Sequence, residues 1–306
     1  MLTYVARRVL VSVPTVLGVA TVIFIMVRLL PGDPARVMAG LLATEEDVAR
    51  IRHQLGLDQP LLLQYLGFMG RLLRGDLGTS TRTGDPVLHE ILVRLPYTAE
   101  LALVATTIAV VVGVAAGILA ATRRNTWIDL FVSGGAVFGL SMPVYWLGLM
   151  LIILFAIQLH ALPAAGSEDP LGFVLPSITL ALFSIALVAR QSRSAMLEVL
   201  GQDYVRTARA KGAAPRTVLL KHALRNALLP ALTIVGFSVA FLITGAVLVE
   251  QIFSWPGIGS YAVTAAESLD FPAIMGVTIV GGAAFLIASL VTDLAYAVAD
   301  PQIRLS

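Results

Sequence analysis

The feature that most constrains this chain is a series of apolar stretches, each about 20 residues long or longer, which is the length of helix needed to cross a bilayer. The six stretches are 9–27, 98–121, 128–158, 171–190, 229–250 and 274–298. Hydrophobic residues make up 58% of the chain and charged residues only 13%, a composition typical of integral membrane proteins. The sequence therefore predicts an all-α membrane protein with six transmembrane helices and a retained first span.

Basic residues indicate how these spans are oriented. The segments predicted to face the cytoplasm carry Arg7, Arg8, Arg123, Arg124, Arg304 and the cluster from Arg190 to Arg225. The short loops 159–170 and 251–273 carry no Lys or Arg. Because short cytoplasmic loops are enriched in positive charge, we expect a multi-pass protein of the cytoplasmic (plasma) membrane with both termini cytoplasmic.

The polar segment between the first two spans has the helix-start and helix-stop residues of a folded domain. Helix-start signals occur at Asp33-Pro34, at Asp85-Pro86 and at Thr44 with Asp47, and helix-stop glycines are Gly56 and Gly75. We therefore predict three parts. They are a first transmembrane helix at 1–30, an extracytoplasmic insertion at 31–97 and a five-helix core at 98–306 with a cytoplasmic loop at 191–228.

Two pairs of glycines spaced four residues apart occur in the predicted spans. They are Gly113 with Gly117 and Gly135 with Gly139. Small residues at this spacing let helices approach closely in a membrane. Such pairs are common in apolar segments, so they predict only that the helices pack as a bundle.

The segment 198–230 is the densest basic region of the chain and contains both of its lysines. Its pattern predicts two short helices, with Gly212 ending the first and Pro215 in the first turn of the second. One interpretation is an amphipathic segment lying on anionic lipid. The other is a docking helix, because the small Ala208 and Gly212 leave a notch for a cytoplasmic protein.

Motifs throughout the chain resemble those of the dipeptide and oligopeptide permeases of ABC importers. The matching strings are FIMVRLLPGDPA at 24–35, QLGLDQPLLLQY at 54–65, GDLGTS at 75–80, GLSMPVYWLGL at 139–149, DYVRTARAKG at 203–212 and VEQIFSWPGIG at 249–259. Three features depart from the wider importer pattern or from the usual sequence of the family. Arg206-Thr207 replaces Glu-Ala, the distance from Gly212 to Leu229-Pro230 is longer, and Leu269 stands where the family often has Arg.

The resemblance implies a type I ABC importer permease fold and a multi-subunit machine. Its other parts would be a second homologous permease, two cytoplasmic ATPases and an extracytoplasmic substrate-binding protein, all working in membrane lipid. ATP and Mg would bind on the partner subunits, with no cofactor on this chain. The residues implied to couple this chain to the ATPases are Tyr204, Arg206, Thr207, Ala208, Arg209, Lys211, Gly212, Ala213 and Pro215.

The fifth predicted span has a face of small or polar residues, formed by Thr233, Ala240, Thr244 and Gln251. These residues either line a translocation path or form a helix contact that needs small side chains. We assign an outer gate to Glu250, Trp255 and Pro256, although Glu250 could equally be a solvated helix end.

Other functions fit the sequence less well. The chain has no cysteine and no G-x-x-x-x-G-K-[ST] motif, and His89-Glu90 lacks a second His at metalloprotease spacing, so neither an enzyme nor a metal site is predicted. Asp293 is assigned to an ion pair with Arg190 or Arg193 rather than to proton transport. The remaining alternatives are import of another small solute, such as a metal chelate or modified peptide, and gradient-driven transport. No nucleic-acid partner is predicted.

Overall fold

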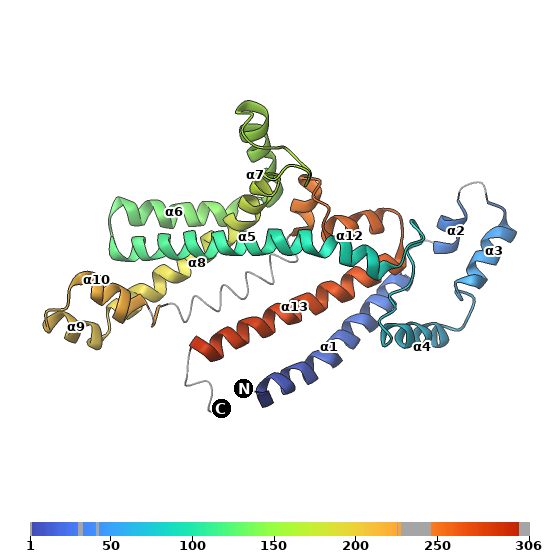
Figure 1. The fold of residues 1–306 in the computed structure, drawn as a ribbon, viewed down its shortest axis with the longest axis horizontal. Helices are drawn as coiled ribbons and strands as arrows, with labels where there is room; N and C mark the ends of the chain where they lie inside the picture. Colours follow the sequence, from blue (N-terminus) through green and yellow to red (C-terminus); the bar gives the residue numbers. More distant parts are fainter. Residues whose placement is uncertain (1, 30–32, 41–42, 225, 228–245, 300–306) are drawn as a thin grey trace. The chain divides into compact units, whose positions relative to one another are not determined.

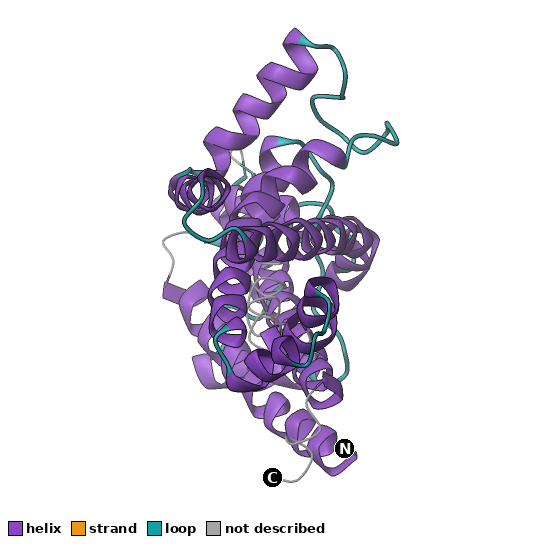
Figure 2. Ribbon diagram, turned by 90° about the vertical axis from the view of Figure 1, so that its left-hand side faces the viewer, coloured by secondary structure: helices purple, strands orange, loops and turns teal. Residues whose placement is uncertain are grey.

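The computed structural model describes residues 2–29, 33–40, 43–224, 226–227 and 246–299 (Figure 1). In these residues the chain forms helices and loops (Figure 2), apart from an isolated antiparallel bridge between Thr79 and Pro86. The chain divides into two compact units. Unit 1 contains residues 99–255 and the chain from 287 onward, and unit 2 contains residues 2–98 and 256–286.

Unit 2 combines the N-terminal helices with the region around α12. Its elements are α1 (Leu2–Leu29), α2 (Pro34–Ala39), α3 (Glu45–Gln54), α4 (Leu61–Leu72), the start of α5 (Val87–Thr122), α12 (Ile258–Glu267) and most of α13 (Phe271–Ala299). The described part of the polar segment after α1 is therefore largely helical, as its helix-start and helix-stop residues predict.

Two of the three predicted helix starts are confirmed. Asp33 caps α2 by accepting the N–H of Ala35 at 3.0 Å, and Thr44 with Asp47 forms a capping box at the start of α3. The predicted cap at Asp85 is wrong, because α5 begins at Val87. Pro86 pairs with Thr79 in the isolated bridge and is not the first residue of the helix.

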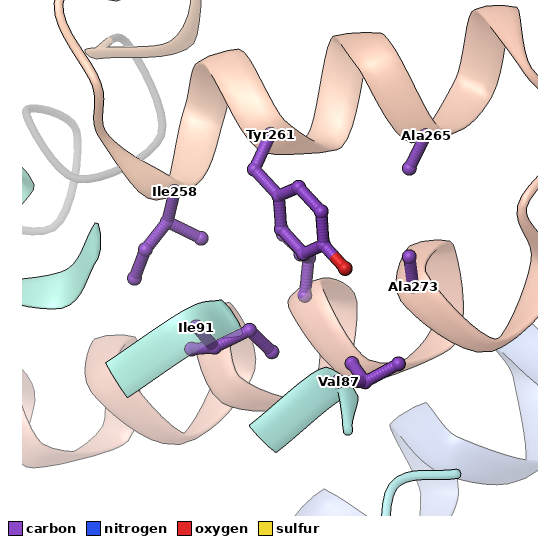
Figure 3. Close-up of a cluster of buried hydrophobic side chains, with 7 residues drawn as sticks. Val87, Ile91, Ile258, Tyr261, Ala265 and Ala273 are labelled. Atoms are coloured by element: carbon purple, nitrogen blue, oxygen red, sulfur yellow. The ribbon is translucent and has the colours of Figure 1, made fainter. Parts of the chain in front are cut away.

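Two apolar clusters hold unit 2 together. In one, Phe24 of α1 stacks on Phe68 and meets Tyr65 edge-on, with ring centroids 5.5 and 5.4 Å apart. In the other, Tyr261 and Ile258 of α12 pack against the first turns of α5 and α13, as Figure 3 shows. Together the clusters attach the N-terminal helices and α12 to α13.

Unit 1 contains the longest apolar helices of the core and the basic segment. Its elements are the remainder of α5, α6 (Trp127–Ser141), α7 (Val144–Leu151), η1 (Ile152–Gln158), α8 (Val174–Leu200), α9 (Asp203–Ala210), α10 (Pro215–Thr217), η2 (Val218–Ala223) and a helix at 246–252. α8 ends at Leu200, ten residues beyond the predicted end of its span at residue 190, so the first part of the predicted loop 191–228 is helical.

The predicted span 128–158 is broken into bent segments and is not one continuous helix. The segment forms α6 and α7 with a 105° bend between them. Met142 is extended, with φ −82° and ψ 125°, because it precedes Pro143, and a proline ring disfavours helical backbone at the residue before it. The apolar run is continuous in sequence, but the chain turns at this proline.

The first glycine pair forms a close contact between α5 and α8. A Cβ atom added to Gly117 would lie 2.6 Å from the carbonyl oxygen of Ala189, and one added to Gly113 would lie 2.8 Å from Cβ of Val188. In the second pair, only one glycine contacts another helix. Gly139 is in ordinary contact with α8, whereas Gly135 has nothing within 4 Å.

Four of the described helices are long and apolar enough to cross a membrane, or up to five if α6 with α7–η1 counts as one span. The four cover Leu10–Leu29, Val87–Thr122, Val174–Leu200 and Phe271–Leu294. Most of the predicted span 229–250 lies outside the described residues. The chain is accordingly a multi-pass, all-α membrane protein.

Candidate coupling site and polar cavity

The basic segment folds as its glycine and proline predict. α9 ends in a Schellman turn, in which the N–H of Ala213 bonds to the carbonyl of Ala208 at 3.1 Å and that of Gly212 bonds to Arg209 at 2.9 Å. Gly212 takes a φ of +79°, which favours glycine, and Pro215 lies in the first turn of α10. The turn reverses the chain between two short helices.

Most of the predicted coupling residues are exposed. Along α9 and the turn, the exposed positions are Tyr204, Arg206, Thr207, Arg209, Lys211, Gly212 and Pro215, while Ala208 and Ala213 are half-buried. The only ion pair found on α9 in the described part of the chain joins Arg206 to Asp203 at 3.5 Å, with both side chains mostly in solvent. This surface is therefore available to a partner protein.

A small apolar anchor holds this exposed element. Val205 is the buried residue of α9, and the Tyr204 hydroxyl accepts a hydrogen bond from Asn226 at 2.8 Å. Beneath it, a cluster joins the ends of α5 and α8 to η2 through Ala121, Met196 and Ala223. The cluster links the segment that begins at α9 to two membrane-spanning helices.

A buried ion pair lies within unit 1. The guanidinium of Arg193 on α8 binds the carboxylate of Asp129 on α6 through two hydrogen bonds of 2.6 and 2.8 Å. Asp129 also accepts the N–H of Asn125 at 3.0 Å, which fixes the turn before α6. The predicted partner of Asp293 is Arg190 or Arg193; Arg193 pairs with Asp129 instead, and the pair with Arg190 stays a prediction. Sequence analysis missed Asp129, whose only signal was an acid at the start of an apolar run.

The predicted path and gate residues are only partly described. Thr233, Ala240 and Thr244 lie outside the described residues, and Gln251 is exposed. Glu250 is fully buried, which overturns its interpretation as a solvated helix end, and Trp255 is buried as well. The N–H of Trp255 bonds to the carbonyl of Glu250 at 2.8 Å. Glu250 and Trp255 belong to unit 1, whereas Pro256 belongs to unit 2.

Unit 2 contains a polar cavity of about 220 Å³, lined mainly by hydroxyl and charged side chains of the 80–94 region and of α12. On its wall, the carboxylate of Asp270 is 1% exposed and accepts a hydrogen bond from the Ser80 hydroxyl. It also accepts the N–H groups of Thr81 at 3.1 Å and Ala273 at 3.3 Å. Asp270 thus joins the segment before α5 to the first turn of α13.

Tyr261 belongs to the apolar cluster of Figure 3 and also lines the cavity. Burial, followed by the negative charges of Asp270 and Glu90, raises the pKa of Tyr261 to about 12. Glu90 pairs with Arg94, whose guanidinium lies 4.6 Å from the centroid of the tyrosine ring. The tyrosine is therefore neutral at pH 7, and its hydroxyl lies beside Ser80 without a well-formed hydrogen bond to any described residue.

In the described residues, no three His, Asp or Glu side chains gather as metal ligands would. The geometry instead offers an exposed helical turn anchored to two spans in unit 1 and a polar cavity in unit 2. The first of these suits contact with a partner protein.

Comparison with known proteins decides the family. The family described as "Binding-protein-dependent transport system inner membrane component" matches residues 113–305, and its N-terminal counterpart matches residues 1–102. The chain belongs to this family of permeases. The resemblance seen in the sequence is therefore confirmed, and the permease is a component of a binding-protein-dependent transport system.

Curated relatives match the permease over almost its whole length. The probable D,D-dipeptide transport system permease protein DdpB of Escherichia coli K12 is 44% identical, covering 94% of this chain and 93% of its own. The di/tripeptide permease DppB of Pseudomonas aeruginosa is 41% identical, with 99% of both chains covered. The glutathione permease GsiC of Salmonella paratyphi A is 42% identical, again over 99% of both chains.

A solved structure supports the fold. A chain from the crystal structure of an amino acid ABC transporter with histidines superposes with a TM-score of 0.54 and 18% identity. The match covers 69% of the permease and 94% of that chain. The permease therefore has the all-α type I importer fold.

Proposed function

We propose that this permease is the membrane-spanning subunit of an ATP-driven importer of di- or oligopeptides. The observation that carries the proposal is the 41–44% identity, over nearly the whole chain, to permeases named for dipeptide and di/tripeptide transport. The exposed turn around Gly212 supports it, since a coupling element must be accessible to a partner and yet anchored to the spans.

In this proposal the chain acts with a second homologous permease, two cytoplasmic ATPases and an extracytoplasmic binding protein. ATP and Mg bind on the ATPases, so the permease is not catalytic by itself. Closure of the ATPase pair moves α9 and the Gly212 turn as a lever, and the bundle switches from inward-open to outward-open. The coupling residues remain those of 204–215.

The proposed topology has six spans, both termini in the cytoplasm and the insertion 31–97 outside, where it helps to receive the binding protein. The distribution of basic residues supports this orientation. Because the chain contains no cysteine, single cysteines at Arg50 and Arg216 can report it directly. A membrane-impermeant thiol reagent added outside intact cells should label R50C and leave R216C unlabelled, and the reverse pattern would overturn the topology.

Thr233, Ala240, Thr244 and Gln251 are proposed to line the translocation path, on the strength of their shared small and polar face. A water-soluble thiol reagent should then label Thr244→Cys at a rate that changes when ATP is trapped on the partner subunits. Val239→Cys and Ile243→Cys, which lie off this face, are the controls. Equal labelling of all three variants in both nucleotide states would place the path on another span.

A second cargo class is favoured by a specific observation, namely the 42% identity to a permease named for glutathione. A modified tripeptide therefore belongs in any cargo test, together with a metal chelate. Selectivity of this kind would reside largely in the binding protein rather than in the permease.

The decisive experiment reconstitutes the purified complex in proteoliposomes with its binding protein. ATPase activity and uptake are measured with dipeptides, longer peptides, glutathione and a metal chelate. We expect peptides to stimulate both ATP hydrolysis and uptake. Uptake that needs an ion gradient and no ATP would overturn the proposal, and stimulation by glutathione alone would select the second cargo.

A further inference from the structure

A cavity of about 620 Å³ opens behind the Gly212 turn. One wall is apolar and comes from the ends of α5 and α8 and from η2, with Ala121, Leu200, Val218 and Leu219 among its residues. Arg209 of α9 and Arg216 of α10 also line the cavity. Its volume lies within the range of roughly 300–1,000 Å³ that is common for small-molecule sites.

The cavity carries positive charge that is not neutralised locally. None of its lining residues is acidic. In the part of the chain that the structure describes, neither Arg209 nor Arg216 forms an ion pair, and the nearby Asp203 pairs with Arg206. Two arginines among the lining residues favour an anion, and a phosphate group matches the planar, multiple donors of a guanidinium well.

The location of the cavity selects the source of this phosphate. α5 ends at Thr122 and α8 at Leu200, and both helices are long and apolar enough to span a membrane. Ala121 and Thr122 line the cavity and stand where the apolar run 98–121 ends, so the cavity lies beside the predicted cytoplasmic end of that span. A free phosphate would contact the two arginines but leave the apolar wall bare, whereas a phospholipid would fill both.

We propose that this cavity binds one anionic phospholipid, with its phosphate on Arg209 and Arg216 and its glycerol and upper acyl carbons against the apolar wall. Basic pockets at the cytoplasmic ends of membrane helices recognise anionic headgroups in this way. The lipid bridges α9 and α10 across the Gly212 turn and ties both to α5 and α8. The inference rests on the proposed function only for the cytoplasmic orientation of this segment.

The test measures lipid binding to the purified full chain, without ATP, binding protein or peptide. Native mass spectrometry is used to titrate phosphatidylglycerol, phosphatidylcholine and inorganic phosphate. We expect one phosphatidylglycerol to bind in preference to phosphatidylcholine, and inorganic phosphate neither to bind detectably nor to displace it. Arg216→Gln should weaken this binding about fivefold and the double variant with Arg209→Gln about 25-fold, since each basic residue near an anionic surface contributes about that factor.

Arg124→Gln is the matched control, because Arg124 is exposed just beyond α5 but does not line the cavity. Arg216→Lys serves if the double variant does not fold, and it should lose part of the binding because it keeps charge but not the planar fork. Equal losses in the control and the cavity variants, or unchanged binding in Arg216→Gln, would overturn the proposal. Equal binding of inorganic phosphate would also overturn it. A failed import assay leaves these measurements unaffected, so the two proposals fail separately.

Discussion

The α5–α8 contact of unit 1 and the junction around Asp270 in unit 2 are both tight, but they are made in opposite ways. Between α5 and α8, Gly113 and Gly117 leave no room for a single added carbon. Around Asp270, one buried carboxylate accepts hydrogen bonds from Ser80, Thr81 and Ala273. The first contact depends on the lack of a side chain at the two glycines. The second depends on the hydrogen bonds that one carboxylate accepts.

The two contacts are therefore disrupted by different kinds of substitution. A contact made by shape is broken when atoms are added, because neighbouring backbone cannot yield. A junction made by polar bonds is broken when an acceptor is removed, because buried donors are left unsatisfied. The following substitutions test this contrast in order of expected effect.

The largest effect is expected for Asp270→Ala. It leaves the Ser80 hydroxyl and two backbone N–H groups without their acceptor, and each unsatisfied buried group costs about 1–3 kcal/mol. The thermal unfolding midpoint should fall sharply. Trypsin should also cleave faster after Arg82, which lies in the segment that Asp270 holds.

Asp76→Ala is the control for that substitution. Asp76 is exposed, and among the described residues its carboxylate accepts the N–H of Gly78 alone, at 2.8 Å. Its loss should cost less than about 1 kcal/mol, the net worth of an ordinary hydrogen bond. If Asp76→Ala and Asp270→Ala lowered stability equally, the buried carboxylate of Asp270 would not be what holds the segment before α5 to the first turn of α13.

Gly117→Ala tests the contact made by shape. The new methyl group would lie 2.6 Å from both the Ala189 carbonyl oxygen and Cβ of Ser192, so the helices must separate, at about 1–3 kcal/mol. Gly135→Ala adds the same atom where nothing lies within 4 Å. That control should be neutral or slightly stabilising, because alanine is the better helix former by about 1 kcal/mol. Thermal midpoints in detergent measure both variants, and matching losses would refute the contrast.

Gly212→Val should affect function more than membrane insertion. An added Cβ meets nothing within 4 Å, so the only strain is the left-handed backbone, which costs on the order of 1–3 kcal/mol for a β-branched residue. We expect normal membrane yield but weaker ATPase co-purification and peptide uptake. Gly212→Asn, which tolerates this conformation, should retain most of the activity. Normal transport by the valine variant would exclude a coupling role for the turn.

The smallest effect on stability is expected for Arg206→Ala. The pair with Asp203 is 3.5 Å long and largely exposed, and such pairs contribute less than about 1 kcal/mol. A loss of ATPase coupling without a loss of stability would then report contact with a partner. Asp203→Asn breaks the same pair from the other side, and an equal loss of coupling in that variant would assign the effect to the pair itself.

Features that depend on a few neighbouring residues were predictable from sequence. The capping box of Thr44 and Asp47 and the turn at Gly212 followed from local backbone chemistry, and the structure confirms both. The close approach at Gly117 was also indicated, although sequence alone could not distinguish it from Gly135, because the difference depends on which helix lies opposite.

Features that join distant residues were not predictable. Asp270 and Ser80 are 190 positions apart, and Asp129 and Arg193 are 64 apart, so no local pattern selects these pairs. The bend at Pro143 did have a local signal, which the continuous apolar run obscured. For the translocation path, the sequence pattern of Thr233, Ala240 and Thr244 stays a prediction.

The bend at Pro143 also bears on the thickness of the surrounding lipid. α6 has 15 residues, and at 1.5 Å per residue it is about 22 Å long, shorter than a hydrocarbon layer of about 30 Å. Because α7 leaves at 105°, it adds little depth. A span shorter than the hydrocarbon layer is accommodated by local thinning of the bilayer, by flanking side chains that reach the interface or by association with other helices, each at a cost that rises with the mismatch. Longer acyl chains in reconstituted vesicles should consequently disfavour whichever transport state keeps α6 upright.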